Sequence, residues 1–330
     1  MKKLLFFVAA MLVLALPAAN AQKVNTSSEL AKLEKADAAA NDAKKGVKAA
    51  TWVARGKAYT DAFMAPTKDL GRGIPAQVVQ MNAGQPQGMI ETELAGTPVV
   101  VFQYEYVDVY LDAATGMVLA WDQKKDIKEG LAKTAIESLA KAYEMDAKQE
   151  SKIAAVALNL ANALAQQGDA LNTMGRTAEA AEAFTLAFAA QSIVPSTTPN
   201  YDNLYNAGLL MTMYASTLQG AEAAAAFKAG EEIFNKALAS GYEDGVGNIY
   251  YYLFHCYYGQ KDSDRATYLA KAKEALLTGI KKFPKNNTIL DGLMQLYTAE
   301  KGVGDPAELV AMIEASLKED PTNYDLWFGR

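Results

Sequence analysis

The chain offers few residues that could do chemistry. His255 is its only histidine and Cys256 its only cysteine. A single histidine excludes metal motifs built on a histidine pair and leaves a Ser-His-Asp triad with one candidate base. His255 lies between Phe254 and Tyr257, which favours a packing role over a basic one. The sequence has no Walker-type phosphate loop, Gly-x-Ser-x-Gly elbow or Cys-x-x-Cys pair. We therefore predict no enzyme activity, no catalytic residue, no metal and no cofactor.

The remaining polar pairs have simpler explanations. Glu231-Glu232 and Glu319-Asp320 are adjacent on expected helices, so their side chains point apart and are solvated. Asp108 and Asp112 lack the alternating oxygen ligands of a calcium loop, and a hairpin turn accounts for Asp112. The lone Cys256 leaves no internal disulfide and, with aromatic neighbours, is predicted to be buried.

The first residues predict export. Met1-Lys2-Lys3 is followed by an apolar run from Leu4 to Leu16 and by the small-x-small site Ala19-Asn20-Ala21. This pattern is typical of a secretory signal peptide over 1–21, because a spanning helix needs about 20 apolar residues. We expect a soluble chain without stable membrane insertion after signal cleavage, secreted across the inner membrane to the periplasm.

The net charge is acidic. Loss of Lys2 and Lys3 takes the charge from −6 to −8, with 30 basic against 38 acidic residues. Nucleic acid and anionic lipid both select basic surfaces, so we expect neither as a partner.

One helical pattern recurs along the chain. After the Gly175-Arg176 turn, the residues Ala180, Phe184 and Ala187 place a large side chain between two small ones on one helix face. A repeat that cannot bury its own apolar face requires neighbouring copies. The further copies are Ala135-Leu139-Ala142, Gly230-Phe234-Ala237, Ala272-Leu276-Gly279 and Leu309-Ile313-Ser316.

This pattern resembles the second helix of the tetratricopeptide repeat (TPR), whose signature ends in Ala-x3-Phe-x2-Ala and a later Pro. Trp52, Gly56 and Tyr59 have the spacing of the first TPR helix, with Arg55 in place of the usual Leu. The resemblance covers Thr51 to Asn323 apart from one insert. It implies an all-α helical repeat, a TPR-like α-solenoid, with a small antiparallel β insert.

The expected organisation follows from this register. We predict a lead-in helix within 22–50, starting near Glu29 with a cap from Thr26-Ser27-Ser28, then a first repeat split into 51–64 and 129–147 by a β-rich insert at 65–128. That these two segments belong to unrelated elements stays open. Four more repeats are expected over 148–323, and 324–330 begin a further helix. Either the sequence is a fragment of a longer protein, which we favour, or another subunit covers this end and the chain self-associates.

Within the insert, Pro and Gly recur between Pro66 and Gly88, which rules out a continuing helix there. The β-branched and aromatic run Val99–Leu111 predicts a long strand, Met117–Trp121 its return and Gly88–Leu94 a third strand. A free edge of this sheet is a candidate site for strand addition.

Function is expected at the surface. In TPR arrays the first helices line a concave groove, and the resemblance transfers this role to specific residues here. The predicted partner-binding residues are Lys57, Asp169, Asn172, Tyr205, Thr212, Tyr252, Asp291 and Gln295. Only Lys57 is basic, which disfavours a carboxylate clamp and favours a protein or peptide held by rings and amides. We expect a non-enzymatic protein-protein interaction scaffold of the cell envelope, acting through the groove or the β insert. The alternative is a glycan or cell-wall binding protein that stacks sugars on the tyrosines at 250–252, 257 and 258.

Overall fold

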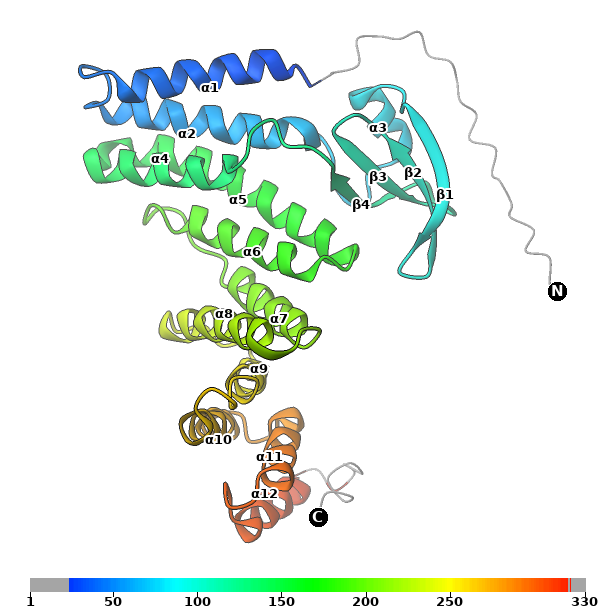
Figure 1. Ribbon diagram of the computed structural model, residues 1–330, viewed down its shortest axis with the longest axis vertical. Coiled ribbons are helices and arrows are strands. Elements are labelled where there is room, and N and C mark those ends of the chain that lie inside the picture. The colour runs from blue at the N-terminus through cyan, green and yellow to red at the C-terminus, as the bar shows by residue number, and fades with distance from the viewer. Residues whose placement is uncertain (1–23, 320, 322–330) are drawn as a thin grey trace, which may run out of the picture. The chain divides into compact units, whose positions relative to one another are not determined.

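A computed structural model describes residues 24–319 and 321. The described chain is mostly helical, with twelve α-helices and a four-stranded antiparallel sheet (Figure 1). It forms two compact units: residues up to Arg176 with Ala189–Thr198, and Thr177–Phe188 with residues from Pro199 onward. The predicted signal peptide and the helix start at 324–330 lie outside the described residues. No described helix is long and apolar enough to cross a membrane.

The first unit begins with a largely solvated helix, α1 (Thr26–Asn41), which packs on α2 (Ala49–Met64). Leu33 is the buried residue of α1. The helix starts earlier than the expected Glu29, because the Asn25 side chain accepts the Ser28 N–H at 3.0 Å and caps it there. The expected cap at Thr26-Ser27-Ser28 is thus inside the helix.

Two helices that are distant in sequence pack together. α2 lies against α4 (Leu131–Met145), although the whole sheet separates them along the chain. Their contact is close because Gly56 has no side chain: a Cβ there would lie 2.6 Å from Cγ of Leu139. Whether these two helices form one split repeat stays a prediction. A short 3-10 turn, Ala147–Gln149, leads from α4 into α5 (Glu150–Thr173).

The sheet is a simple meander. Its order is β1 (Gly88–Leu94), β2 (Thr97–Gln103), β3 (Val107–Asp112) and β4 (Val118–Gln123), all antiparallel. The expected strand at Gly88–Leu94 is present, and the return strand runs slightly later than predicted. The prediction of one long strand over Val99–Leu111 is wrong. The chain reverses between β2 and β3, where the Tyr104 N–H donates to the Val107 carbonyl at 2.9 Å.

The Pro- and Gly-rich segment also contains a short helix that the sequence pattern did not predict. α3 (Ala76–Ala83) fits between two of the breakers, after the 3-10 turn Ala65–Thr67. Pro75 precedes the first turn, where a missing N–H costs nothing, and Gly84 ends the helix at φ 81°. Val79 of α3 is fully buried in the core of the sheet, with Phe102 and Val109.

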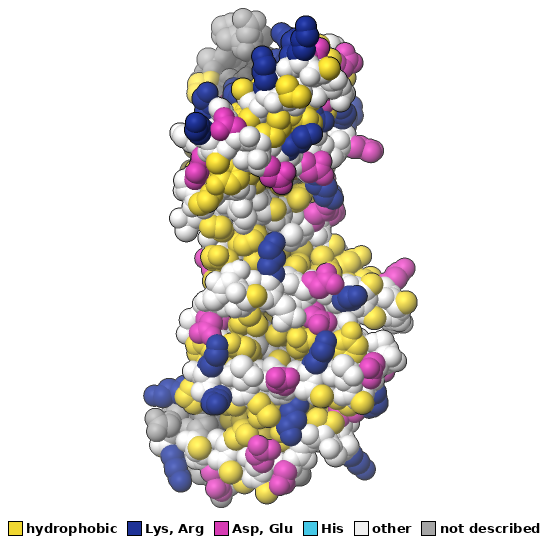
Figure 2. All heavy atoms as spheres, turned by 90° about the vertical axis from the view of Figure 1, so that its left-hand side faces the viewer, with side chains coloured by type: hydrophobic (Ala, Val, Ile, Leu, Met, Phe, Trp, Pro, Cys, Tyr) yellow, Lys and Arg dark blue, Asp and Glu magenta, His cyan; other side chains and the backbone are white. Residues whose placement is uncertain are grey.

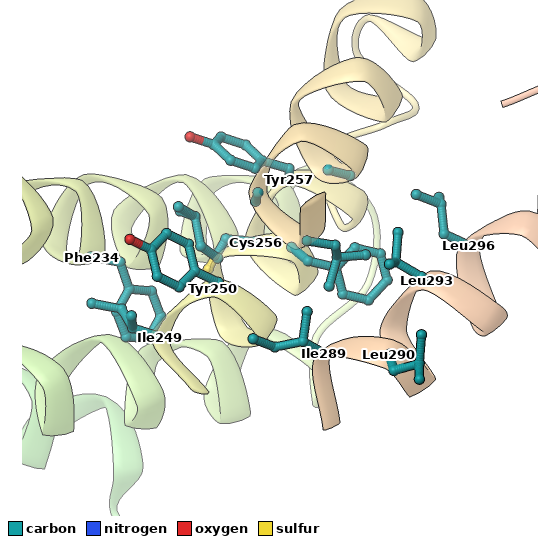
Figure 3. Close-up of a cluster of buried hydrophobic side chains, with 14 of the residues drawn as sticks. Phe234, Ile249, Tyr250, Cys256, Tyr257, Ile289, Leu290, Leu293 and Leu296 are labelled. Atoms are coloured by element: carbon teal, nitrogen blue, oxygen red, sulfur yellow. The ribbon is translucent and has the colours of Figure 1, made fainter. Parts of the chain in front are cut away.

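The second unit is helical throughout its described part. Its elements are α7 (Asp202–Ala215), α8 (Gly220–Ala239), α9 (Asn248–Tyr258), α10 (Arg265–Lys282), α11 (Asn287–Ala299) and α12 (Pro306–Glu319). α6 (Thr177–Gln191) contributes residues to both units. Figure 3 shows the core, in which Phe234, Ile249 and Leu293 are fully buried. The large residues of the recurring pattern are all buried: Leu139, Phe184, Phe234, Leu276 and Ile313.

Candidate functional site

Two predicted site residues meet in an aromatic group on the second unit. Tyr205 of α7 and Tyr252 of α9 have ring centroids 6.2 Å apart, and both rings contact Phe234 of α8 at 6.3 Å. Tyr242, from the loop after α8, lies 6.2 Å from Tyr205 and 6.1 Å from Tyr201. We call these five residues the α7–α9 aromatic cluster. Phe234 is its buried base, and its four tyrosines are half-buried.

Local sequence explains how the cluster forms. Tyr201 and Tyr205 are four residues apart, so they share one face at the start of α7. Asp244 caps α9: its carboxylate accepts the N–H of Ile249 at 3.0 Å and that of Gly247. These hydrogen bonds hold the loop that leads into α9, and one turn into that helix the Tyr252 ring contacts Phe234 of α8.

Two carboxylates accompany the rings. The Tyr242 hydroxyl donates to Oδ1 of Asp202 at 2.6 Å. Burial raises the pKa of Tyr205, and the nearby Asp244 carboxylate raises it further. Burial and then the hydrogen bond to Asp202 raise the pKa of Tyr242. The hydroxyls therefore stay protonated in neutral solution. The cluster offers ring edges, hydroxyl donors and negative charge, which suits a polypeptide better than an anion.

Thr212 does not belong to this surface. It is only 5% exposed, and its hydroxyl donates to the Gly208 carbonyl at 2.8 Å. Its other neighbour is the Sγ atom of Cys256 at 3.2 Å. Thr212 therefore packs α7 against α9 and presents no polar atom to a partner. Cys256 is buried as predicted, and burial raises the pKa of its thiol to about 12.

Three predicted residues lie on the first unit. Lys57 is exposed on α2 and pairs with Asp61 at 2.6 Å, one turn away. Asp169 and Asn172 are exposed on α5. Desolvation raises the pKa of Asp169, against the opposing charge of Arg72. An exposed i,i+4 ion pair is a common solvated feature, so Lys57 has no geometry that singles it out.

The last two predicted residues lie on α11. Gln295 is exposed and Asp291 is half-buried. α11 packs against α9 and α10. Neither residue joins the α7–α9 aromatic cluster, whose members come from α7, α8, α9 and the loop before α9.

The candidate chemistry residues have structural roles. The His255 ring lies 4.5 Å from that of Tyr251, edge to face, and burial lowers its pKa. Asp112 accepts the backbone N–H groups of Ala114 and Thr115 at 3.0 and 2.7 Å, as a turn residue does. Among the described residues, no group of three or more His, Cys, Asp or Glu side chains is placed to hold a metal ion.

A charged network that the sequence reasoning missed joins α1, α2 and α4. Arg55 donates through Nε to Asp37 at 2.8 Å and through Nη1 to the Ser138 hydroxyl at 2.7 Å. Tyr59 and Lys128 also donate to the Asp37 carboxylate, at 2.8 and 3.3 Å. Desolvation alone would raise the pKa of Asp37, but these hydrogen bonds outweigh it and lower the pKa. The sequence feature that could have indicated this network is Arg55, which occupies the position where the TPR pattern has Leu.

Tyr242 and Asp244 were also missed, because the Gly241 turn marked only the end of a helix. Their roles depend on contacts across the fold.

The first unit further contains a cleft of about 340 Å³ beside the turn between β2 and β3. Lys68, Gln87 and Glu105 are among its polar lining residues. Glu105 is the single carboxylate among the lining residues, and we assign the cleft no reaction.

The surface drawn in Figure 2 mixes basic and acidic side chains, with apolar ones between them. On this face the described residues form no extended patch of a single charge.

Comparison of the sequence with family models and with curated proteins gives no match.

Proposed function

We propose that this chain is an exported, non-enzymatic TPR-like scaffold of the cell envelope that binds a segment of another protein. The observation that carries the proposal is the α7–α9 aromatic cluster, where half-buried tyrosines, donor hydroxyls and two carboxylates occur together. Tyrosine is enriched in protein interfaces because it combines a large apolar ring with a polar tip.

Support for the repeat comes from equivalent contacts in two helix pairs. Gly56 of α2 faces Leu139 of α4, and Gly208 of α7 faces Phe234 of α8. In the TPR pattern both glycines take the position of the first helix that is usually Gly. Leu139 and Phe234 take the position of the second helix that is usually Phe. The same residue-to-residue contact in two places favours a common unit, one copy of which has the sheet inserted between its helices.

The glycan alternative has less support. Of the tyrosines proposed to stack sugars, Tyr250 is 4% and Tyr257 is 9% exposed. Tyr251 and Tyr258 are half-buried, and both pack against Phe254. Sugar stacking needs an open ring face, and these rings are buried or packed against other aromatic side chains.

The proposal is tested by photo-crosslinking in cells. A benzophenone amino acid replaces Tyr252 in the exported chain, and a matched variant carries it at Ala225, an exposed position of α8. We expect one protein adduct from position 252 and none from position 225. The purified partner should then bind a Tyr205→Ala and Tyr252→Ala variant at least about tenfold more weakly than a Tyr214→Ala control.

Thermal unfolding of both variants checks that the fold survives. If position 252 gives no protein adduct and the purified chain is instead retained on cell-wall polysaccharide, the scaffold proposal fails and the glycan alternative replaces it.

A further inference from the structure

The outer edge of the sheet is open. β1 pairs with β2 on one side, and it is the terminal strand of the sheet (Figure 1). No described strand or bridge lies on its other side. An open edge exposes a row of unpaired peptide groups that another strand can pair with.

The hairpin turn determines which peptide groups point outward. Ala95 and Gly96 form a two-residue turn with φ values of 49° and 80°, as in a type I′ hairpin. Such a turn makes the flanking pair, Leu94 and Thr97, a hydrogen-bonded pair. Because bonded and non-bonded pairs alternate along an antiparallel ladder, Thr92 and Ile90 also bond to β2.

Met89, Glu91 and Glu93 therefore direct their N–H and C=O groups away from the sheet. The side chains of these same residues are exposed. Met89 and Ile90 are 56% and 47% exposed, although both are large and apolar. β1 has no Pro, Lys or register shift, which are frequent means of blocking an edge.

The charges on β1 select the partner. Glu91 and Glu93 both project from one face of the strand, and neither forms an ion pair within the described part of the chain. Two copies of β1 paired antiparallel around Glu91 or Thr92 would bring these carboxylates opposite one another, which is destabilising. A strand with Lys or Arg at alternate positions would instead place a cation opposite each carboxylate.

We propose that β1 accepts an extended, basic segment of another protein as a fifth strand. The backbone of the segment pairs with Met89, Glu91 and Glu93, and its alternate basic side chains pair with the two carboxylates. This site lies on the first unit and is argued independently of the α7–α9 aromatic cluster.

The test uses the full chain and a blocked peptide of alternating Lys and Val, with an alternating Glu and Val peptide as control. Residue-resolved hydrogen exchange should show the amides of Met89, Glu91 and Glu93 slowed about tenfold or more by the basic peptide. The amides of Ile90 and Thr92 should be protected already without the peptide, because they bond to β2. Binding of neither peptide, or protection elsewhere, overturns the proposal.

Variants separate the two components of recognition. The double variant Glu91→Lys, Glu93→Lys should no longer bind the Lys peptide and should bind the Glu peptide instead. The control double variant Glu222→Lys, Glu274→Lys, at exposed sites of α8 and α10, should leave the binding of both peptides unchanged. Met89→Pro removes one outward N–H and should weaken binding at least about fivefold relative to Met89→Ala, which keeps that N–H. Equal binding by these two Met89 variants contradicts strand pairing.

Varying the concentration of the chain distinguishes pairing between two copies of β1 from binding of a basic segment. If the outward amides become protected in the peptide-free chain as its concentration rises, a second copy occupies the edge and the basic-partner proposal is wrong. Loss of crosslinking at Tyr252 has no bearing on this result, since the two sites are tested by different readouts.

Discussion

The substitution Gly208→Ala tests the contact between α7 and α8 directly. A Cβ at position 208 would lie 2.6, 2.7 and 2.8 Å from three ring atoms of Phe234. Ordinary carbon–carbon contacts lie at about 3.5–4.0 Å, so the ring must move by about 1 Å. Phe234 is fully buried, and the rings of Tyr205 and Tyr252 lie against it. The ring therefore has little room to yield.

Two opposing effects set the change in the free energy of unfolding. Overpacking a buried site costs about 1–3 kcal/mol, while replacing Gly by Ala within a helix returns about 1 kcal/mol. We expect Gly208→Ala to lower the free energy of unfolding by about 1 kcal/mol. Phe234→Leu should also destabilise, by removing buried ring atoms. In the double variant the shorter Leu side chain leaves room for the new methyl group, so the two costs should fall short of additive by at least about 0.5 kcal/mol.

Urea unfolding followed by far-ultraviolet circular dichroism measures these free energies. Because the chain has two compact units, the relevant transition is the one that Phe234→Leu shifts. Ala225→Gly, at an exposed position of α8, measures how much the choice between Ala and Gly in a helix contributes to stability without a packing change. A Gly208→Ala protein as stable as the parent, or additive costs in the double variant, would refute the close contact and with it the main support for a shared repeat unit.

Three further predictions concern polar side chains at contacts between helices. Asp37→Asn should lower the free energy of unfolding by about 1 kcal/mol at neutral pH, because three donors, Arg55, Tyr59 and Lys128, lose their charged acceptor. The pKa of Asp37 is lowered by these hydrogen bonds, so this difference should be complete above about pH 5 and shrink as the pH falls through the folded-state pKa; a difference in urea midpoints that does not change as the pH falls contradicts it. Arg55→Leu, the residue typical of the TPR pattern, should destabilise rather than stabilise, and adding Asp37→Leu should recover part of the loss in the same urea assay. Cys256 should resist iodoacetamide at about pH 8 until urea unfolds the chain, since burial raises its pKa to about 12; labelling of the folded protein, seen by mass spectrometry, would contradict its burial.

Two of the predicted site residues lie together, and their role in binding stays a prediction. Tyr205 and Tyr252 were identified from their positions one step beyond the packing residues, and they do meet at one surface. The same rule selected Thr212, which is buried because α9 brings Cys256 against it. Tyr242 and Asp244 carry no local pattern, since a loop residue acquires its role from the helices around it. Sequence spacing orders residues on one helix and does not say which neighbour covers them.

The sequence alone determined the features that depend on contacts a few residues apart. The spacing of Leu139, Phe234 and Leu276 predicted buried helix faces, because residues three and four apart share one side of a helix. The run of β-branched and aromatic residues likewise predicted a small antiparallel sheet within a mainly helical chain. Only the tertiary structure decided where Val99–Leu111 reverses and that α3 covers the sheet with Val79. It also placed Arg55 on Asp37 and, among the described residues, left the outer edge of β1 unpaired. These features depend on contacts between residues far apart in the chain, and no local window of sequence contains both partners.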